Sequence, residues 1–159
     1  YNSISIYAFH PMYIDLNQLG KMKDKEALAV FEARRQELNA LPQIDYEAVN
    51  NAKRAYLKVM FQQTGRKVLA SDEFKRFFEE NEHWLLPYAA FSYLRDLYGT
   101  PDFSQWPEHT EYKAEEIAAL CAPDSSCYEE IAFYYYTQYH LHIQLLDAGN
   151  YAREKRYYL

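Results

Sequence analysis

The longest apolar pattern in the chain runs from residue 131 to residue 153. At helical spacing its apolar residues cover most of the helix surface, so the pattern predicts a helix that is buried on most sides. Ser126 and Glu129 fit a capping box, which places the start of this helix near Ser126. The apolar positions are Ala132, Tyr135, Tyr136, Tyr139, Ile143 and Leu146 on one face and Tyr134, Leu141 and Leu145 on another.

The polar residues of this helix fall into two narrow rows, one with Thr137, His140 and Gln144 and the other with Gln138 and His142. Because burying a polar group without a hydrogen bond is costly, each should find a partner on a neighbouring element. The two histidines are two positions apart and point roughly 200° apart around a helix. We therefore do not expect them to share a metal ion.

Two earlier helical patterns predict a helical hairpin. The first spans residues 24–41 and is closed by Pro42. The second spans residues 45–64, and Gly65 is well placed to end it. The short connection between the two patterns favours neighbouring helices.

Two more helices are predicted after this hairpin. Ser71 or Asp72 can cap the first of them, and the second is expected over residues 84–98. Pro87 would then lie in a first helical turn, where a missing amide hydrogen is tolerated.

The two ends of the chain predict extended structure. Residues 1–16 alternate small polar residues with β-branched or aromatic ones and contain His10 followed by proline, which does not favour a continuing helix. Residues 155–159 are typical of the start of a strand. The chain also begins at Tyr1 in the middle of a pattern, so any targeting segment of a parent protein would lie outside this sequence.

Composition narrows the classes of partner. Aromatic residues make up 18% of the 159 residues, a content that suits either large buried contacts or a groove that stacks on sugars. The net charge of −6 argues against a phosphate-binding surface, so we expect no nucleic-acid partner. No apolar run approaches the ~18 residues of a membrane span, and the mean hydropathy of −0.54 agrees, so we expect no membrane partner.

The sequence contains no recognisable catalytic motif. Cys121 and Cys127 have the spacing of neither a zinc knuckle nor a redox pair, which favours free thiols and a cytoplasmic protein. A nucleophile elbow and a phosphate-binding loop are both absent from the sequence, and the clustered glutamates are expected on solvated helix faces. We therefore predict no catalytic residue, no metal site and no cofactor in this chain.

Three stretches carry motifs of one known family, in the same order. Residues 83–108, HWLLPYAAFSYLRDLYGTPDFSQWPE, resemble the signature "WL..YA.F..L......W..WP", and residues 131–145, IAFYYYTQYHLHIQL, resemble the helix "F..F.QW.F..QW". Residues 1–16 are similar to the loop "SPY...SAFAGNP..IDL", with Phe9 and His10 in place of Gly-Asn. The family is that of the 4-α-glucanotransferases, or amylomaltases, of glycoside hydrolase family 77. The chain looks most like the branch of the plant cytosolic disproportionating enzyme and its bacterial relatives.

The resemblance implies a mostly α-helical subdomain excised from a (β/α)8 barrel enzyme, with short extended segments at both ends. Residues 1–23 would form a loop of the glucan cleft, residues 24–122 a helical insertion, and residues 123–159 a barrel helix and the start of the next strand. Such enzymes transfer α-1,4-glucan chains through a covalent intermediate on an Asp, without a cofactor. Their catalytic acids would lie beyond Leu159, so the chain alone should be inactive.

The resemblance also implies two substrate-binding residues. Tyr1 matches the tyrosine of the "SPY" motif, which lies at the glucan cleft of the family, although the same ring would also suit an anchor for the loop. His10 occupies the position of the family's asparagine and is a candidate sugar contact. The expected partner is an α-glucan or maltooligosaccharide. The departures at Phe9 and His10 leave the acceptor open, because the plant branch favours maltose as donor and branched polysaccharide as acceptor.

A second class of function remains open, that of a free-standing helical module whose aromatic surface binds a protein partner. Such a module requires a complete core. The enzyme segment should instead leave an apolar flank of the 131–153 helix exposed, and this flank would offer a contact for a dimer.

Overall fold

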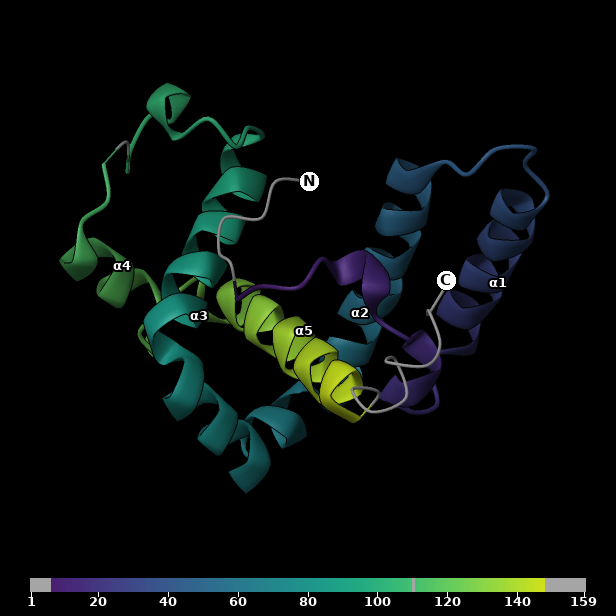
Figure 1. Cartoon of the computed structure of the whole chain (residues 1–159), viewed down its shortest axis with the longest axis horizontal. Helices are drawn as coiled ribbons and strands as arrows, with labels where there is room; N and C mark the ends of the chain where they lie inside the picture. The colour runs from purple at the N-terminus through teal and green to yellow at the C-terminus, as the bar shows by residue number, and fades with distance from the viewer. Residues whose placement is uncertain (1–6, 110, 148–159) are drawn as a thin grey trace. The chain divides into compact units, whose positions relative to one another are not determined.

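The computed structural model describes residues 7–109 and 111–147, and within these ranges the structure is helical and contains no strand. The extended structure predicted for residues 1–6 and 155–159 lies outside the described residues, whereas the mostly helical prediction is confirmed inside them. In chain order the elements in Figure 1 are the 3-10 helices η1 (Pro11–Tyr13) and η2 (Leu16–Leu19), the α-helices α1 (Lys25–Asn39), α2 (Tyr46–Leu69) and α3 (Asp72–Tyr98), the 3-10 helix η3 (Phe103–Gln105), and the α-helices α4 (Ala114–Leu120) and α5 (Tyr128–Asp147).

The chain divides into two compact units, and α5 contributes residues to both. Among the described residues, the first unit contains residues 9–71 and 136–147, and the second contains residues 7–8 and 72–135 without residue 110. Each unit buries its own set of large apolar side chains, such as Leu57 and Met60 in the first and Leu85 and Leu94 in the second.

Helices α1 and α2 of the first unit form the predicted hairpin. Each begins directly after an aspartate: a carboxylate oxygen of Asp24, and likewise one of Asp45, accepts a hydrogen bond of 3.0 Å from an amide of the first turn. These caps satisfy amides that have no partner inside the helix. The rings of Phe31 and Tyr56 then meet edge to face across the hairpin, with centroids 4.7 Å apart.

Gly65 does not end α2, which continues to Leu69, so the predicted end at this glycine is wrong. A Cβ atom at Gly65 would lie 2.6 Å from the ring carbon Cδ1 of Phe61. The ring of Phe61 also packs against Tyr136, with centroids 5.3 Å apart. Gly65 therefore serves as the place where α2 accommodates an aromatic ring, and this packing outweighs its poor helix propensity.

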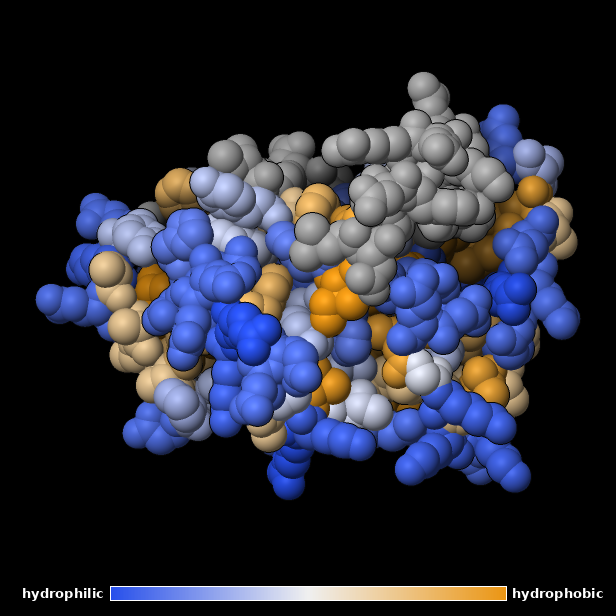
Figure 2. Space-filling view, turned by 60° about the horizontal axis from the view of Figure 1, so that its bottom comes forward, coloured by the Kyte–Doolittle hydropathy of each residue, from blue (hydrophilic) through white to orange (hydrophobic). Residues whose placement is uncertain are grey.

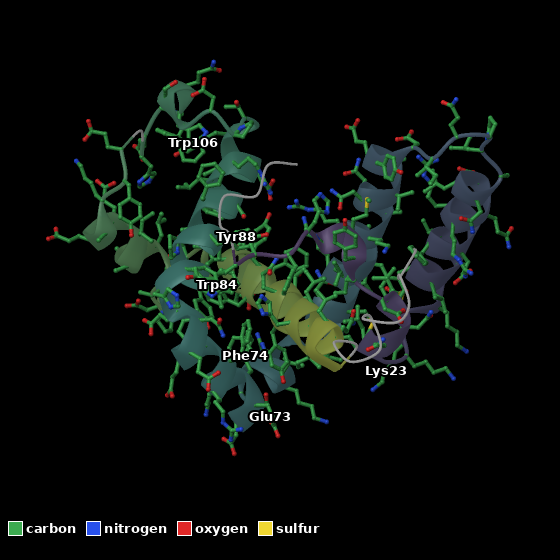
Figure 3. The ribbon with its side chains drawn as sticks, in the orientation of Figure 1. Lys23, Glu73, Phe74, Trp84, Tyr88 and Trp106 are labelled. Atoms are coloured by element: carbon green, nitrogen blue, oxygen red, sulfur yellow. The ribbon has the colours of Figure 1, made fainter. Side chains whose placement is uncertain are left out.

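Helix α3 of the second unit is one continuous helix rather than the two predicted, and Pro87 lies inside it. Apolar side chains on both sides of the proline are buried: Phe74, Trp84 and Tyr88 lie along the helix in Figure 3, and each is at most 5% exposed. A proline inside a helix removes one hydrogen bond, and we attribute the continuity of α3 to the burial of these side chains.

Trp106 fixes the irregular segment after α3 in the second unit (Figure 3). Its ring is 5% exposed and packs against Phe91 and Tyr98 of α3, with centroids 5.4 Å and 5.7 Å away. Its indole nitrogen donates a hydrogen bond of 2.8 Å to the carbonyl oxygen of Thr100. One buried aromatic residue thus supplies both the apolar contact and the polar contact of this segment.

Helix α5 is buried, as its sequence predicts. It begins at Tyr128, two residues after Ser126. Every residue from Ile131 to Tyr139 is at most 9% exposed. The exposed apolar flank expected on this helix is therefore not found over these residues, and the dimer stays a prediction. Figure 2 shows hydrophilic residues over much of one face of the molecule, with hydrophobic residues in separate groups between them.

Candidate functional site

The structure describes only one of the two predicted substrate-binding residues. Tyr1 lies outside the described residues, whereas His10 lies in the segment 9–15 of the first unit. We call residues 9–15 the N-terminal loop. This loop contains η1, which contacts α2, as Figure 1 also shows.

His10 is the cap of η1. Its Nδ1 atom accepts a hydrogen bond of 3.0 Å from the backbone amide of Met12. An Nδ1 that accepts a hydrogen bond carries no proton, so the proton of the neutral ring lies on Nε2. Burial lowers the pKa of His10 below its usual value, which favours the neutral ring. The neutral ring of His10 carries one N–H group, and N–H groups and flat rings are features that suit a sugar.

Two aromatic side chains of the same loop are exposed. Tyr13 is 60% exposed, and its ring approaches His10 edge to face with centroids 6.3 Å apart. Phe9 is 37% exposed, and its ring packs against the ring of His142 with centroids 4.5 Å apart. Sequence reasoning missed Tyr13. The spacing of three residues between His10 and Tyr13 is a signal in the sequence that could have indicated it. Side chains three residues apart in a 3-10 helix lie one above the other, which brings Tyr13 close to the cap residue His10.

Two glutamines of α5 hold the ends of the N-terminal loop. Gln138 accepts a hydrogen bond of 3.1 Å from the amide of Phe9 and donates one of 2.8 Å to the carbonyl oxygen of the same residue. Gln144 makes the same reciprocal pair with Asp15, at 2.8 Å and 3.0 Å. Both glutamines are buried, so the prediction that the polar residues of this helix need partners is confirmed for them.

Lys53 of α2 holds the middle of the loop. Its Nζ atom donates hydrogen bonds of 2.7 Å to the carbonyl oxygen of Met12 and 3.0 Å to that of Ile14. Burial lowers the pKa of Lys53 to about 8, although the charge of Asp15 acts in the opposite direction. Side chains of α2 and α5 thus bond the loop backbone at its start, middle and end.

The remaining histidine of the predicted polar rows, His140, is a core residue. Its ring packs against Tyr136 and Tyr139, with centroids 4.5 Å and 5.4 Å away. Its buried Nε2 atom has no hydrogen-bond partner among the described residues, so the expected partner is not found there. Burial lowers the pKa of His140 to about 4, and the ring is neutral at pH 7.

The described residues contain neither a cluster that fits a metal ion nor a membrane-spanning helix. No group of three or more His, Cys, Asp or Glu side chains comes together in residues 7–109 and 111–147. None of the helices in the same ranges has the length and hydrophobicity that a membrane span requires. Cys121 and Cys127 are buried free thiols, as their spacing predicts. The N-terminal loop, with the exposed ring of Tyr13 beside His10, is the candidate functional site.

Comparison with known proteins identifies the family. The sequence pattern of the 4-alpha-glucanotransferase family, Glyco_hydro_77, matches residues 1–159, so the chain belongs to this family of enzymes. It is 37% identical to the 4-alpha-glucanotransferase DPE2 of Oryza sativa subsp. japonica over 98% of the chain. It is 28% identical to the 4-alpha-glucanotransferase of Chlamydia muridarum over 98% of the chain, and 27% identical to that of Chlamydia pneumoniae over 96%.

The chain spans only a small part of these relatives. It covers 16% of the rice protein and 29% of the Chlamydia muridarum protein. The family resemblance derived from the three sequence motifs is thus confirmed, and the short coverage agrees with a segment of a longer enzyme. No solved structure matches the chain significantly.

Proposed function

We propose that this chain is part of a 4-α-glucanotransferase that transfers α-1,4-glucan chains between maltooligosaccharides with retention of configuration. Membership of the family carries this proposal. Within it, the chain is a helical subdomain of a (β/α)8 barrel enzyme of the cytoplasm, and the catalytic acids and any dimer contacts belong to other parts of the protein. The enzyme needs no cofactor, and its acceptors include branched polysaccharides such as starch or glycogen.

The N-terminal loop forms part of the wall of the glucan cleft in this proposal. The single-turn helix η1 presents the ring of His10 beside the exposed ring of Tyr13. Flat rings and N–H donors are the groups that commonly contact sugars. His10 and Tyr1 are the proposed substrate-binding residues, and Tyr13 joins them because of its exposure and its contact with His10. The alternative, a free-standing protein-binding module, gains no support from the family match.

The activity is tested with the complete protein that contains this chain. Incubation with maltotriose should yield glucose and a series of longer maltooligosaccharides, which chromatography separates by chain length. Unchanged maltotriose, together with no transfer from maltose to glycogen, under conditions where a known 4-α-glucanotransferase is active would contradict the proposed function.

The role of His10 is tested by two substitutions in the same protein. His10→Ala should raise the KM for maltotriose about threefold to tenfold, since one hydrogen bond is typically worth about 0.5–1.5 kcal/mol. His10→Gln keeps a donor and an acceptor and should recover part of this loss. His83→Ala removes an exposed histidine of α3 and serves as the matched control, with an unchanged KM. Equal KM values for His10→Ala and the parent would show that His10 does not bind the substrate.

A further inference from the structure

The N-terminal loop has an unusual attachment. Its own backbone hydrogen bonds, from Tyr13 to His10 and from Ile14 to Pro11, are local and only close η1. The bonds that connect it to α5 come from the amide groups of Gln138 and Gln144. Lys53 of α2 bonds the middle of the loop, so the position of the loop on α5 itself depends on those two side-chain amides.

The two glutamine pairs match each other in spacing. The bonded residues of the loop, Phe9 and Asp15, are six positions apart, and so are Gln138 and Gln144 on α5. Six residues of an α-helix rise about 9 Å, so the two pairs bind the loop at two well separated points along the helix. Two reciprocal pairs at a fixed spacing specify one register of the loop, because a shift along α5 would break all four bonds.

The chemistry of the pairs requires an amide at the end of the side chain. A glutamine amide offers one acceptor and one donor, which match the N–H and C=O groups of a single backbone residue. Gln138 is fully buried, so a carboxylate there would place negative charge against the carbonyl oxygen of Phe9 without a proton to donate. Asparagine is one methylene shorter and cannot span the same distance.

We propose that Gln138 and Gln144 are positioning residues of the glucan cleft, which fix the register of the N-terminal loop on α5 and thereby place His10 and Tyr13 for the sugar. This inference rests on the proposed function. Gln138 has the larger effect on substrate binding, because it bonds the residue directly before His10, whereas Gln144 bonds the far end of the loop. The contact of Phe9 with the ring of His142 adds to the attachment of the loop at the end next to His10.

The variant Gln138→Glu in the complete protein tests this role. Burial favours the protonated form of a carboxyl group at this position. Above the pH at which it ionises, the carboxylate cannot donate to Phe9, and the KM for maltotriose should rise about tenfold while kcat changes less than about twofold. A protonated carboxylic acid again offers one donor and one acceptor. The KM of this variant should therefore approach that of the parent at acidic pH. The side chains of His10 and His142 beside Phe9 are the same in both proteins, so the ratio of the two KM values isolates the new carboxyl group.

Gln63→Glu is the matched control. Gln63 of α2 is half-buried and bonds two backbone groups outside the N-terminal loop, accepting a hydrogen bond of 2.9 Å from the amide of Lys23 and donating one of 2.9 Å to the carbonyl oxygen of Lys21. This variant should lower the melting temperature while leaving the KM at the parental value. Gln138→Met, which is similar in shape and cannot ionise, should raise KM at every pH and replaces Gln138→Glu if that variant does not fold.

Three outcomes decide the matter. A KM that rises in Gln138→Glu, returns at acidic pH and does not change in Gln63→Glu supports the inference. An active parent with an unchanged KM in Gln138→Glu and Gln138→Met overturns the inference and leaves the proposed function intact. A parent protein that does not transfer glucan at all overturns the proposed function, and the positioning role falls with it.

Discussion

Single residues of this protein show how buried polar groups acquire different roles from their neighbours. On α5, Gln138 finds two backbone partners and holds a loop, whereas the Nε2 atom of His140 finds none among the described residues. Lys53 of α2 has two carbonyl partners, as Gln138 has two backbone partners, but burial still lowers its pKa to about 8. The energetic role of a buried polar residue therefore depends on what lies opposite, and sequence periodicity does not contain that information.

His140 should make the protein sensitive to acid. Its pKa is about 4 in the folded protein against a usual 6.5, so the unfolded chain binds more protons between these values. The stability from the neutral ring is fully present above pH 6.5 and is lost as the pH falls through 4. The loss should amount to at most about 3 kcal/mol. His140→Phe should reduce this acid dependence of the unfolding free energy, which denaturant titrations at pH 7 and pH 4.5 measure.

The exposed histidine of α3 provides the control for this prediction. His83→Phe leaves His140 in place and should retain the acid dependence of the parent. An identical acid dependence in His140→Phe and the parent would show that the neutral form of His140 does not contribute to stability.

Whole elements of this protein depart from their local signals where tertiary packing is strong. Gly65 and Pro87 are both residues that often end helices, yet α2 continues past the first and α3 past the second. At Gly65 the reason is the ring of Phe61, and at Pro87 it is the burial of residues such as Phe74 and Trp84 on both sides. Helix ends are thus decided by the contacts along the whole element and not by one residue.

Gly65→Ala should destabilise the protein, although alanine is the better helix former by about 1 kcal/mol. The added Cβ would lie 2.6 Å from Cδ1 of Phe61, and we expect a net loss of about 1–3 kcal/mol, measured by thermal denaturation. The double variant Gly65→Ala with Phe61→Leu should recover part of the loss relative to the sum of the single variants. A stabilised Gly65→Ala protein would mean that the ring moves aside at little cost.

The molecule as a whole belongs to the 4-alpha-glucanotransferase family, and it spans only a part of the rice and Chlamydia muridarum relatives. Its described residues form two units that each bury large aromatic side chains, with Tyr136 in the first and Tyr135 in the second. Burial raises the pKa of both tyrosines, so they are neutral at any physiological pH. The high tyrosine content thus supplies core packing on α5, while the N-terminal loop presents Tyr13 at the surface.

Residues 1–159 expressed alone should not transfer glucan, because the resemblance to the family implies catalytic acids in parts of the enzyme outside this chain. Maltotriose incubated with this segment should keep its chain length, whereas the complete protein should redistribute it under the same conditions. Circular dichroism of the segment provides the control that it is helical. Redistribution of maltotriose by the segment alone would show that its own carboxylates are sufficient for the reaction.

The sequence by itself determined the helical class, the hairpin of α1 and α2, the burial of α5 and the family. These properties follow from periodicity and from three ordered motifs, all of which are local in the chain. It also indicated His10 as a candidate sugar contact, though only through the resemblance.

Only the tertiary structure decided how the candidate site is held. The bonds of Gln138 and Gln144 join residues 129 positions apart, and the continuity of α2 past Gly65 involves Phe61 together with Tyr136. Hydrogen bonds and ring contacts act over a few ångströms, so they depend on which distant residues the fold brings together. Local patterns specify the helices, and contacts between distant segments specify where the N-terminal loop lies on them.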